Sequence, residues 1–283
     1  MLKTSREVFF YYHGLGDSIL FNSVVYELGR QTGKSYLIGT RHREIYRGNP
    51  HATLLPFSQN LNYKIFGLPA RLLGLRIHNI DYYFEGRPPK RHILQLLCER
   101  VGLKPAIERP TIYLSPEERA RKDLPPIGKP WVAIQSTGLS TWTENKNWGV
   151  ENFRAVVQAL QSQVAFVQLG ASSDPSLGVD LELQGKIKPR DACVLLRQCR
   201  AFVGQVGFLM HAAAAVNVPS VIVYGGFEAP WQSGYPMNLN LYSDVECAPC
   251  WLESNCPHEK KCMAMIKPEI VVEKTKSLLG HLD

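Results

Sequence analysis

The feature that most constrains this chain is a repeated order of short apolar run, glycine turn and amphipathic helix. Near the N-terminus, Val8–Tyr12 has the composition of a buried strand, and His13–Gly16 that of a tight turn. A helix is expected from Asp17 onward. Its apolar face carries Leu20, Val24 and Leu28. Tyr36–Gly39 then predicts a second strand. This order is the unit of a parallel α/β sheet, in which ligands meet the turns at the carboxyl ends of the strands.

The same order restarts in the second half of the chain. Three prolines and a glycine within Leu124–Pro130 indicate a linker. Beyond it, strands are expected at Trp131–Gln135, Val164–Leu169, Ala201–Val203 and Ser220–Tyr224, and helices over Phe153–Leu160, from Pro189, over Phe208–Val216 and from Pro268. Between Arg41 and Arg109 no period persists. We therefore predict an α/β protein with an N-terminal domain over 1–125, a second domain over 126–266 and a closing helix over 267–283.

Length and composition favour two globular domains. The 283 residues, 45% apolar and 20% charged, give each domain enough material for its own core. No window approaches the roughly 18 consecutive apolar residues of a membrane span, and Val8–Tyr12 is too short for a signal-peptide core, so a cytoplasmic protein is expected.

Lys and Arg outnumber Asp and Glu by 32 to 25, a net charge of +7. This excess fits partners that carry phosphate or an anionic membrane surface, and an ordinary solvated surface explains it equally well.

The first candidate site is the turn that ends in Asp17. Gly14 and Gly16 let the backbone come close to a ligand, and the start of the helix offers free N–H groups. The turn is not a dinucleotide-binding fingerprint, because the third glycine is missing. Asp17 is therefore either the cap of its helix or a carboxylate base that acts on a hydroxyl.

Three further turns follow predicted strands of the second domain. The loop after the first strand carries Thr137 and Lys146, as a phosphate site requires, although a solvated surface lysine is the plainer interpretation. Trp148 is expected to be a packing anchor. The second turn carries Gly170 and, within reach of a ribose, Asp174. The third turn precedes a helix whose N-terminus could hold a pyrophosphate, and involves Gly207, Phe208 and His211, the histidine being equally well a core residue.

Taken together and in this order, these motifs resemble glycosyltransferase family 9, the lipopolysaccharide heptosyltransferase-like family. They are G-x-G-D at 14–17, K-x-W at 146–148, G-K-x at 185–187 and G-x-x-G-x-x-x-H-A-A-A from Gly204, followed by V-P-S-V-I-V-Y-G. The resemblance is strongest over Trp131–Met265 and thin over Arg41–Arg109. It implies a GT-B fold, in which two Rossmann-like α/β domains with parallel sheets face a central cleft.

The resemblance also implies an inverting transfer of a sugar, here expected to be heptose, from a nucleotide-activated donor, expected to be ADP-linked. The acceptor would be a hydroxyl of a cell-surface glycan, lipid-linked or protein molecule, met in the cytoplasm or at the inner face of the membrane, and nucleic acid is not an expected partner. By residue matching, Asp17 would be the base, Lys146 would contact the donor phosphates and Asp174 would hold the ribose. The remaining donor-binding positions would be Gly16, Thr137, Gly170, Lys186, Gly207, Phe208 and His211. No catalytic metal is expected, because a lysine and a helix dipole take its place.

One departure from the family pattern lies at Gly204–Gly207. The family usually has G-x-D-[ST]-G at this turn, whereas Gln205 and Val206 provide neither the aspartate nor the hydroxyl. Either the donor is held through backbone N–H groups, or the choice of donor or the activity differs. A catalytically degenerate member that binds nucleotide or a partner is thus an alternative.

The cysteines fall into two groups. Cys98, Cys193 and Cys199 lie in apolar or helical contexts and are expected to be buried. The other four form C-x2-C-x5-C-x5-C, at Cys247, Cys250, Cys256 and Cys262. They are expected to hold a structural zinc or iron ion, with free thiols or a disulfide as alternatives. The family resemblance supports the metal, because related autotransporter heptosyltransferases bind iron there. A nucleic-acid-binding module with a zinc ribbon is a rival that leaves the α/β core unexplained.

Overall fold

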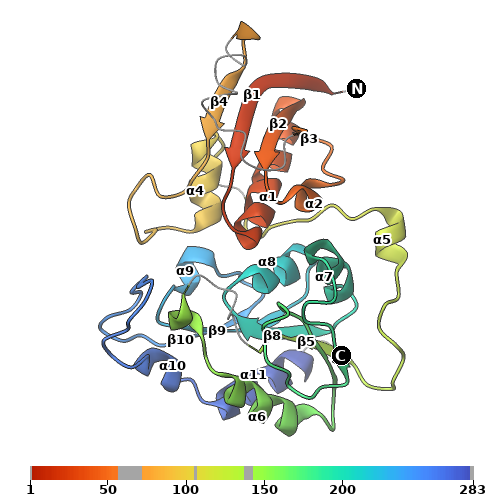
Figure 1. The fold of residues 1–283 in the computed structure, drawn as a ribbon, viewed down its shortest axis with the longest axis vertical. Coiled ribbons are helices and arrows are strands. Elements are labelled where there is room, and N and C mark those ends of the chain that lie inside the picture. Colours follow the sequence, from red (N-terminus) through yellow and green to blue (C-terminus); the bar gives the residue numbers. More distant parts are fainter. Residues whose placement is uncertain (1, 57–71, 105–106, 137–142, 281–283) are drawn as a thin grey trace. The chain divides into compact units, whose positions relative to one another are not determined.

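A computed structural model describes residues 2–56, 72–104, 107–136 and 143–280 (Figure 1). The chain divides into two compact units, Met1–Pro116 and Glu117–Asp283. Each unit is built on its own sheet, and every strand pairing among the described residues is parallel. No helix in these described ranges has the length and apolarity to cross a bilayer.

The first unit is a four-stranded sheet with its helices (Figure 1). The strand order is β3-β2-β1-β4, with β1 at Lys3–Tyr11, β2 at Lys34–Thr40, β3 at Ala52–Leu54 and β4 at Arg76–Asn79. The helices are α1 at Leu15–Thr32, α2 at Arg43–Tyr46 and α4 at Ile93–Arg100. Helix α1 ends at Gly33, whose φ of 66° is the left-handed conformation that glycine adopts at low cost. Residues 8–11 of β1 are all buried, as expected of an inner parallel strand covered on both faces.

The second unit contains a six-stranded sheet of order β10-β9-β8-β5-β6-β7. Its strands are β5 at Trp131–Ile134, β6 at Ala165–Gln168, β7 at Leu181–Glu182, β8 at Ala201–Gln205, β9 at Ser220–Gly225 and β10 at Leu239–Tyr242. Its helices are α5 at Pro116–Ala120, the 3-10 turn η1 at Glu144–Lys146, α6 at Val150–Leu160, α7 at Pro189–Leu196, α8 at Phe208–Ala215, α9 at Pro230–Ser233, α10 at Lys261–Ala264 and α11 at Pro268–Gly280. Apolar residues of α6 and α11 share one core with the sheet.

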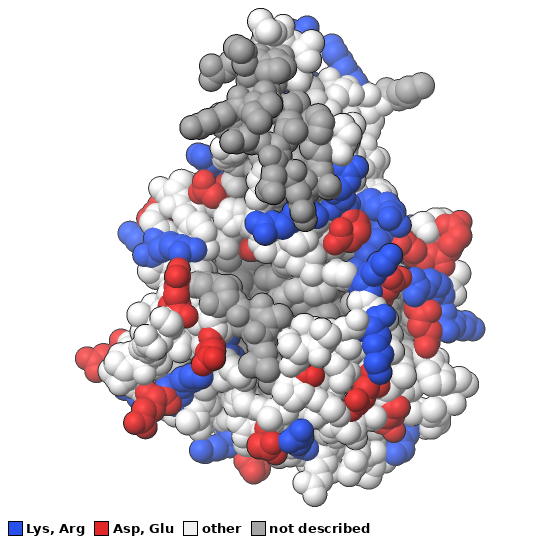
Figure 2. Space-filling view, viewed as in Figure 1, with Lys and Arg blue, Asp and Glu red and all other residues white. Residues whose placement is uncertain are grey.

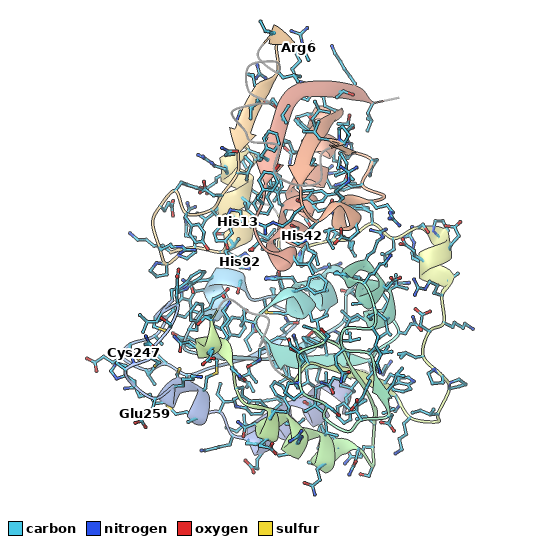
Figure 3. The ribbon with its side chains drawn as sticks, in the orientation of Figure 1. Arg6, His13, His42, His92, Cys247 and Glu259 are labelled. Atoms are coloured by element: carbon cyan, nitrogen blue, oxygen red, sulfur yellow. The ribbon has the colours of Figure 1, made fainter. Side chains whose placement is uncertain are left out.

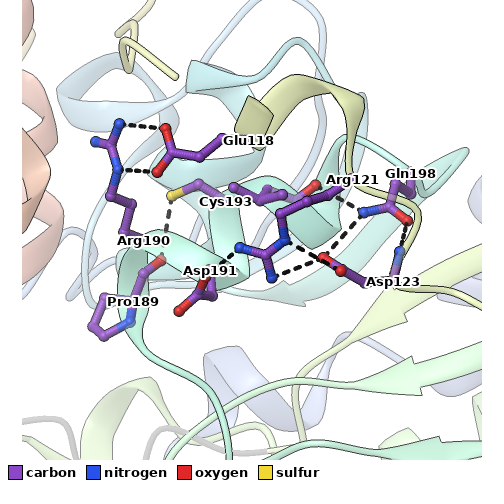
Figure 4. Close-up of polar contacts among 9 residues, drawn as sticks. Glu118, Arg121, Asp123, Pro189, Arg190, Asp191, Cys193 and Gln198 are labelled. Carbon is purple, nitrogen blue, oxygen red and sulfur yellow. Dashed lines mark hydrogen bonds and ion pairs between the residues drawn. The ribbon is translucent and has the colours of Figure 1, made fainter. Parts of the chain in front are cut away.

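The segment that opens the second unit is tied to helix α7 by ion pairs (Figure 4). The Arg190 guanidinium, 6% exposed, donates to both carboxylate oxygens of Glu118 at 2.6 and 2.7 Å. Arg121 pairs with Asp191 of the same helix and with Asp123. Two charged contacts from a short segment to one helix explain why the chain groups with the second unit from Glu117 onward.

Charged side chains of both signs are visible on one face of the molecule (Figure 2). On the face shown in Figure 2, acidic and basic groups are interspersed over the second unit. Among the described residues, this face therefore shows no patch of one sign over the second unit.

Candidate functional site

Asp17 lies in the first turn of α1 and both of its carboxylate oxygens are engaged. Gly14 is the N-cap, and its backbone N–H donates to Oδ2 of Asp17 at 3.1 Å. Asp17 is thus the third residue of the helix rather than its N-cap, and its carboxylate bonds back to the N-cap backbone. Oδ1 accepts a hydrogen bond from the Tyr82 hydroxyl at 3.2 Å. Gly16 is part of the same first turn. The bond to Gly14 uses only one carboxylate oxygen of Asp17, and Tyr82 binds the other. The contact at the helix start is therefore compatible with a further role for Asp17 as a base.

Imidazoles gather near this end of the first sheet. His13 follows β1, His42 follows β2 and His92 is the N-cap of α4, and Figure 3 shows the three in one region. Burial lowers the pKa of His42, and the neighbouring charge of Arg41 acts in the same direction. Polar, titratable side chains thus lie at the carboxyl ends of these parallel strands, where ligand sites of α/β sheets form.

Lys146 lies at the end of η1 and is not a solvated surface lysine. Its side chain is 12% exposed, and Nζ lies 2.8 Å from Oε2 of Glu228, whose side chain is 5% exposed. The ammonium also lies 4.8 Å from the ring centroid of Phe227. Burial acts to raise the pKa of Glu228, but the charge and hydrogen bond of Lys146 hold it below its usual value. The pair is therefore ionised inside the unit.

Sequence reasoning missed Glu228. It lies 82 positions from Lys146 and three residues after Gly225, the last residue of strand β9. An acidic residue following a buried strand and a glycine turn was the available signal. It is the same signal by which Asp17 and Asp174 were chosen.

The turn between β8 and α8 is connected to the lysine loop by Gln205. Its side-chain oxygen accepts a hydrogen bond from the backbone N–H of Trp148, and the side chain is 3% exposed. Gly207 is the N-cap of α8 and Phe208 its first residue. Trp148 is itself buried, as predicted, and packs edge-on against Phe153 at 4.8 Å. The residue that departs from the family pattern thus joins two of the predicted donor-site motifs.

His211, in the first turns of α8, is buried next to the Lys146–Glu228 pair. Its Nδ1 lies 2.5 Å from the hydroxyl of Tyr235, and its charge acts on Glu228. The carboxylate also bonds the hydroxyl of Ser233. Lys146 and Glu228 thus form a buried ion pair, and His211 of α8 interacts electrostatically with its carboxylate. This is the arrangement expected of a site for a phosphate-bearing ligand.

Asp174 holds its own turn together. Its Oδ2 accepts from the backbone N–H of Ala171 at 3.2 Å and from Gln135 at 3.5 Å. Gly170 has a φ of 145°, and a Cβ there would lie 2.1 Å from Oδ2 of Asp174, so this position requires glycine. The Gly170 carbonyl also accepts from the N–H of Gly185 at 2.9 Å, which brings the G-K-x turn alongside.

Lys186 and Thr137 are the two remaining residues predicted to bind the donor. Lys186 donates from Nζ to the backbone carbonyl of Glu182 at 2.8 Å, which places it beside the Gly170 turn. Thr137 lies outside the described residues.

The four clustered cysteines lie between β10 and the end of α10 (Figure 3 labels Cys247), and two of them, Cys250 and Cys262, lie next to Gly226. The N–H of Cys250 donates to the Gly226 carbonyl at 3.1 Å, and Sγ of Cys262 lies 3.2 Å from where a Gly226 Cβ would be. None of the seven cysteines, all of them within the described residues, is in a disulfide. Among the described residues no set of three or more His, Cys, Asp or Glu side chains has the arrangement of a metal site. The predicted metal is thus not shown.

The three scattered cysteines are buried, as predicted. Burial raises the pKa of Cys193 and of Cys199 to about 12, so both thiols are protonated and unreactive.

Sequence comparison identifies relatives of this chain. The profile of glycosyltransferase family 9 (heptosyltransferase) matches residues 90–261. Lipooligosaccharide heptosyltransferase 2 of Campylobacter jejuni serotype O:2 is 31% identical over 104 residues, which are 35% of this chain and 32% of that protein. The serotype O:6 protein of the same name is 29% identical over 101 residues, or 34% and 31%. The alignments thus span about a third of these curated relatives.

Solved structures share the fold over nearly the whole chain. A glycosyltransferase family 9 protein of Veillonella parvula has a TM-score of 0.72 at 15% identity, covering 99% of this chain and 98% of its own. The Escherichia coli ADP-heptose lps heptosyltransferase II also scores 0.72 at 15% identity, with coverages of 98% and 99%. The iron-containing dodecameric glycosyltransferase TibC of enterotoxigenic E. coli scores 0.74 at 15% identity, with 100% and 78%. The expected GT-B fold class, with two parallel α/β sheets, is confirmed. Because the family profile covers more than half of its residues, the chain belongs to glycosyltransferase family 9.

Proposed function

We propose that this protein is an inverting heptosyltransferase that moves heptose from an ADP-linked donor to a hydroxyl of a cell-surface glycan acceptor, at the cytoplasmic face of the membrane. Family membership supports the reaction type. The names of the relatives support the sugar, and a solved complex of TibC with ADP-D-beta-D-heptose supports the donor. The net charge of +7 is compatible with a phosphorylated or lipid-linked acceptor at an anionic surface.

The observation that carries the proposal is the buried ammonium of Lys146 near the start of α8. The first turn of a helix presents unpaired N–H groups and the positive end of its dipole, which favour a diphosphate. Glu228 pairs with Lys146 and interacts electrostatically with His211 of α8, and Gln205, at the end of the strand before α8, accepts from the backbone of the lysine loop. These fixed charges and dipoles would stabilise the negative charge that develops on the departing ADP.

The proposed reaction is one displacement. Asp17 takes the proton of the acceptor hydroxyl, the acceptor oxygen bonds to the anomeric carbon, and the bond from that carbon to the phosphate oxygen breaks, releasing ADP with inversion. Asp174 and Gly170 would meet the ribose, and Thr137 and Lys186 would line the nucleotide side. Gly16, Gly207 and Phe208 would allow close approach of backbone to ligand.

Donor specificity can be tested by thermal unfolding of the purified protein with ADP, GDP, UDP and CDP. Since a ligand that binds only the folded state stabilises it, ADP at a hundred times its Kd should add about 2.7 kcal/mol to the free energy of unfolding. We expect the rise with ADP to exceed that with the other three. If folded protein responds to none of the four, the site does not bind nucleotides, and the degenerate member that binds a partner becomes the better account.

The departure at Gln205 leaves the turn packed. The Gln205 side chain is buried and its oxygen is bonded to the lysine loop, so the donor can still be held through backbone N–H groups. Family membership also removes the reason for the nucleic-acid-binding alternative, because the α/β core that it left unexplained is that of a glycosyltransferase.

For the clustered cysteines we propose a structural zinc or iron ion. Four thiols are the donor set that tetrahedral zinc or a single iron prefers, and such a metal would hold a loop of unusual backbone. Of the five described non-glycine residues with positive φ, four lie in this loop, at Trp251, Asn255, Glu259 and Lys260. One structural relative, TibC, is iron-containing. The metal would supply no chemistry to the transfer.

Metal analysis of the purified protein should find close to one zinc or iron per chain. Cys250→Ser should lose the metal and lower the unfolding temperature, because a ligand is removed from the folded state. Cys199→Ser is the matched control, since Cys199 is a buried thiol outside the cluster, and it should keep the metal. Folded wild-type protein without metal, and unaffected by a chelator, would contradict the proposal.

A further inference from the structure

The carboxylate of Asp17 faces buried tyrosine hydroxyls from three different elements. Tyr11 ends β1, Tyr46 lies in α2 and Tyr82 follows β4, and their exposed fractions are 0%, 1% and 5%. Burial raises the pKa of each hydroxyl, and the negative charge of Asp17 adds to it. All three are neutral at the pH of the cell, and the Tyr82 hydroxyl donates its hydrogen bond to the carboxylate.

Tyr82 is held in place by the segment that carries it. Its hydroxyl accepts a hydrogen bond from Tyr83 at 3.1 Å, and the two rings lie 4.4 Å apart. The N–H of Tyr83 donates to Oδ1 of Asp81 at 3.0 Å, and the guanidinium of Arg87 lies 4.2 Å above the Tyr83 ring. The His13 ring lies 5.3 Å from that of Tyr82 and 6.0 Å from that of Tyr83. A cluster of three mutually packed, tilted rings thus holds the hydroxyl that reaches Asp17.

We propose that Tyr82 is a positioning residue for Asp17, fixing Oδ1 of the carboxylate while the Gly14 N–H fixes Oδ2. The inference rests on the proposed function of Asp17 as the base. With both oxygens bonded, the carboxylate plane is set before an acceptor arrives, so less orientation has to be achieved in the transition state. A donated hydrogen bond also stabilises the ionised form, which is the form that accepts a proton. Tyr83 and Arg87 support the arrangement from behind.

The test is Tyr82→Phe, which removes the hydroxyl and keeps the ring. We expect kcat for ADP release from ADP-heptose to fall about tenfold, since a hydrogen bond to a charged group is lost, with the ADP affinity unchanged. The acid limb of the pH–rate profile should move to higher pH, because the ionised carboxylate loses a donor. The other groups that face it, Tyr11, Tyr46, Tyr83 and His13, stay in place. Tyr83→Phe should act in the same direction with a smaller effect.

A second measurement does not depend on an acceptor. In protein with 13C-labelled aspartate, the carboxyl signal of Asp17 should titrate at higher pH in Tyr82→Phe than in wild type. Tyr113→Phe is the matched control, because this tyrosine of the same unit stacks on Tyr26 and is no part of the proposed site. If Tyr82→Phe changes neither the titration of the Asp17 carboxyl nor kcat, the inference is overturned. It is also overturned if the fall in kcat is accounted for by a smaller fraction of folded Tyr82→Phe protein. If Asp17→Asn retains transfer, the base assignment itself fails, whereas loss in Asp17→Asn with a normal Tyr82→Phe removes only this inference.

Discussion

Asp17→Asn should abolish sugar transfer and leave ADP binding intact. The amide cannot accept the proton of the acceptor hydroxyl, and the loss of a general base typically costs about 10²–10⁴ in rate. Asparagine retains a side-chain oxygen that can accept from the Gly14 N–H, so the start of α1 should survive. ADP release from ADP-heptose measures the rate, and the thermal shift with ADP measures binding.

Two further variants separate the chemical from the structural contribution. Asp17→Ala loses the bond to the Gly14 N–H as well as the base, and should therefore be less stable than Asp17→Asn by about 0.5–1.5 kcal/mol at equal inactivity. Glu27→Gln removes a carboxylate from the same helix, where Glu27 bonds to Arg30 and Gln31, and should leave the rate unchanged. If Asp17→Asn transfers at the wild-type rate, Asp17 is a helix cap and another group is the base.

The inner strands of both sheets could be predicted, and the edge strands could not. Runs such as Val8–Tyr11 and Ser220–Gly225 are buried on both faces, so they are continuously apolar and stand out in the sequence. The missed strands, β3, β4, β7 and β10, are the two edges of each sheet. Strand β7 has two residues and β3 three, too few to show any period. Their residues are partly exposed, so polar side chains interrupt the pattern.

The site divides along similar lines. Asp17 and Lys146 lie in turns that follow predicted strands, so local order was enough to select them. Their partners are set by packing between distant segments: Tyr82 lies 65 positions from Asp17, and Glu228 lies 82 from Lys146. Tyr82 falls in a stretch where no period persists, and local sequence holds no sign of which hydroxyl will reach the carboxylate. The role of Gln205 could not be predicted for the same reason, since its partner is a backbone N–H in another loop.

Lys146→Met should weaken ADP binding at least tenfold and also destabilise the protein. The first effect follows from loss of a charge that would meet the phosphates. The second follows from Glu228, whose side chain is only 5% exposed and would keep its negative charge with no cation to pair with it. Breaking a buried ion pair by removing one partner typically costs about 3–5 kcal/mol. Urea unfolding gives the stability, and titration with ADP gives the affinity.

The double variant Lys146→Met/Glu228→Gln distinguishes a donor-binding lysine from a structural one. Neutralising both members of a buried pair removes the uncompensated charge, so stability should return towards wild type. ADP affinity should stay low, because the ammonium is still absent. If the double variant recovers affinity together with stability, Lys146 serves only to neutralise Glu228, and the phosphates are held by the start of α8 alone. Lys129→Met is the control, since Lys129 is exposed and its ammonium donates to the backbone carbonyl of Gln161. It should change neither the stability nor the ADP affinity as Lys146→Met does.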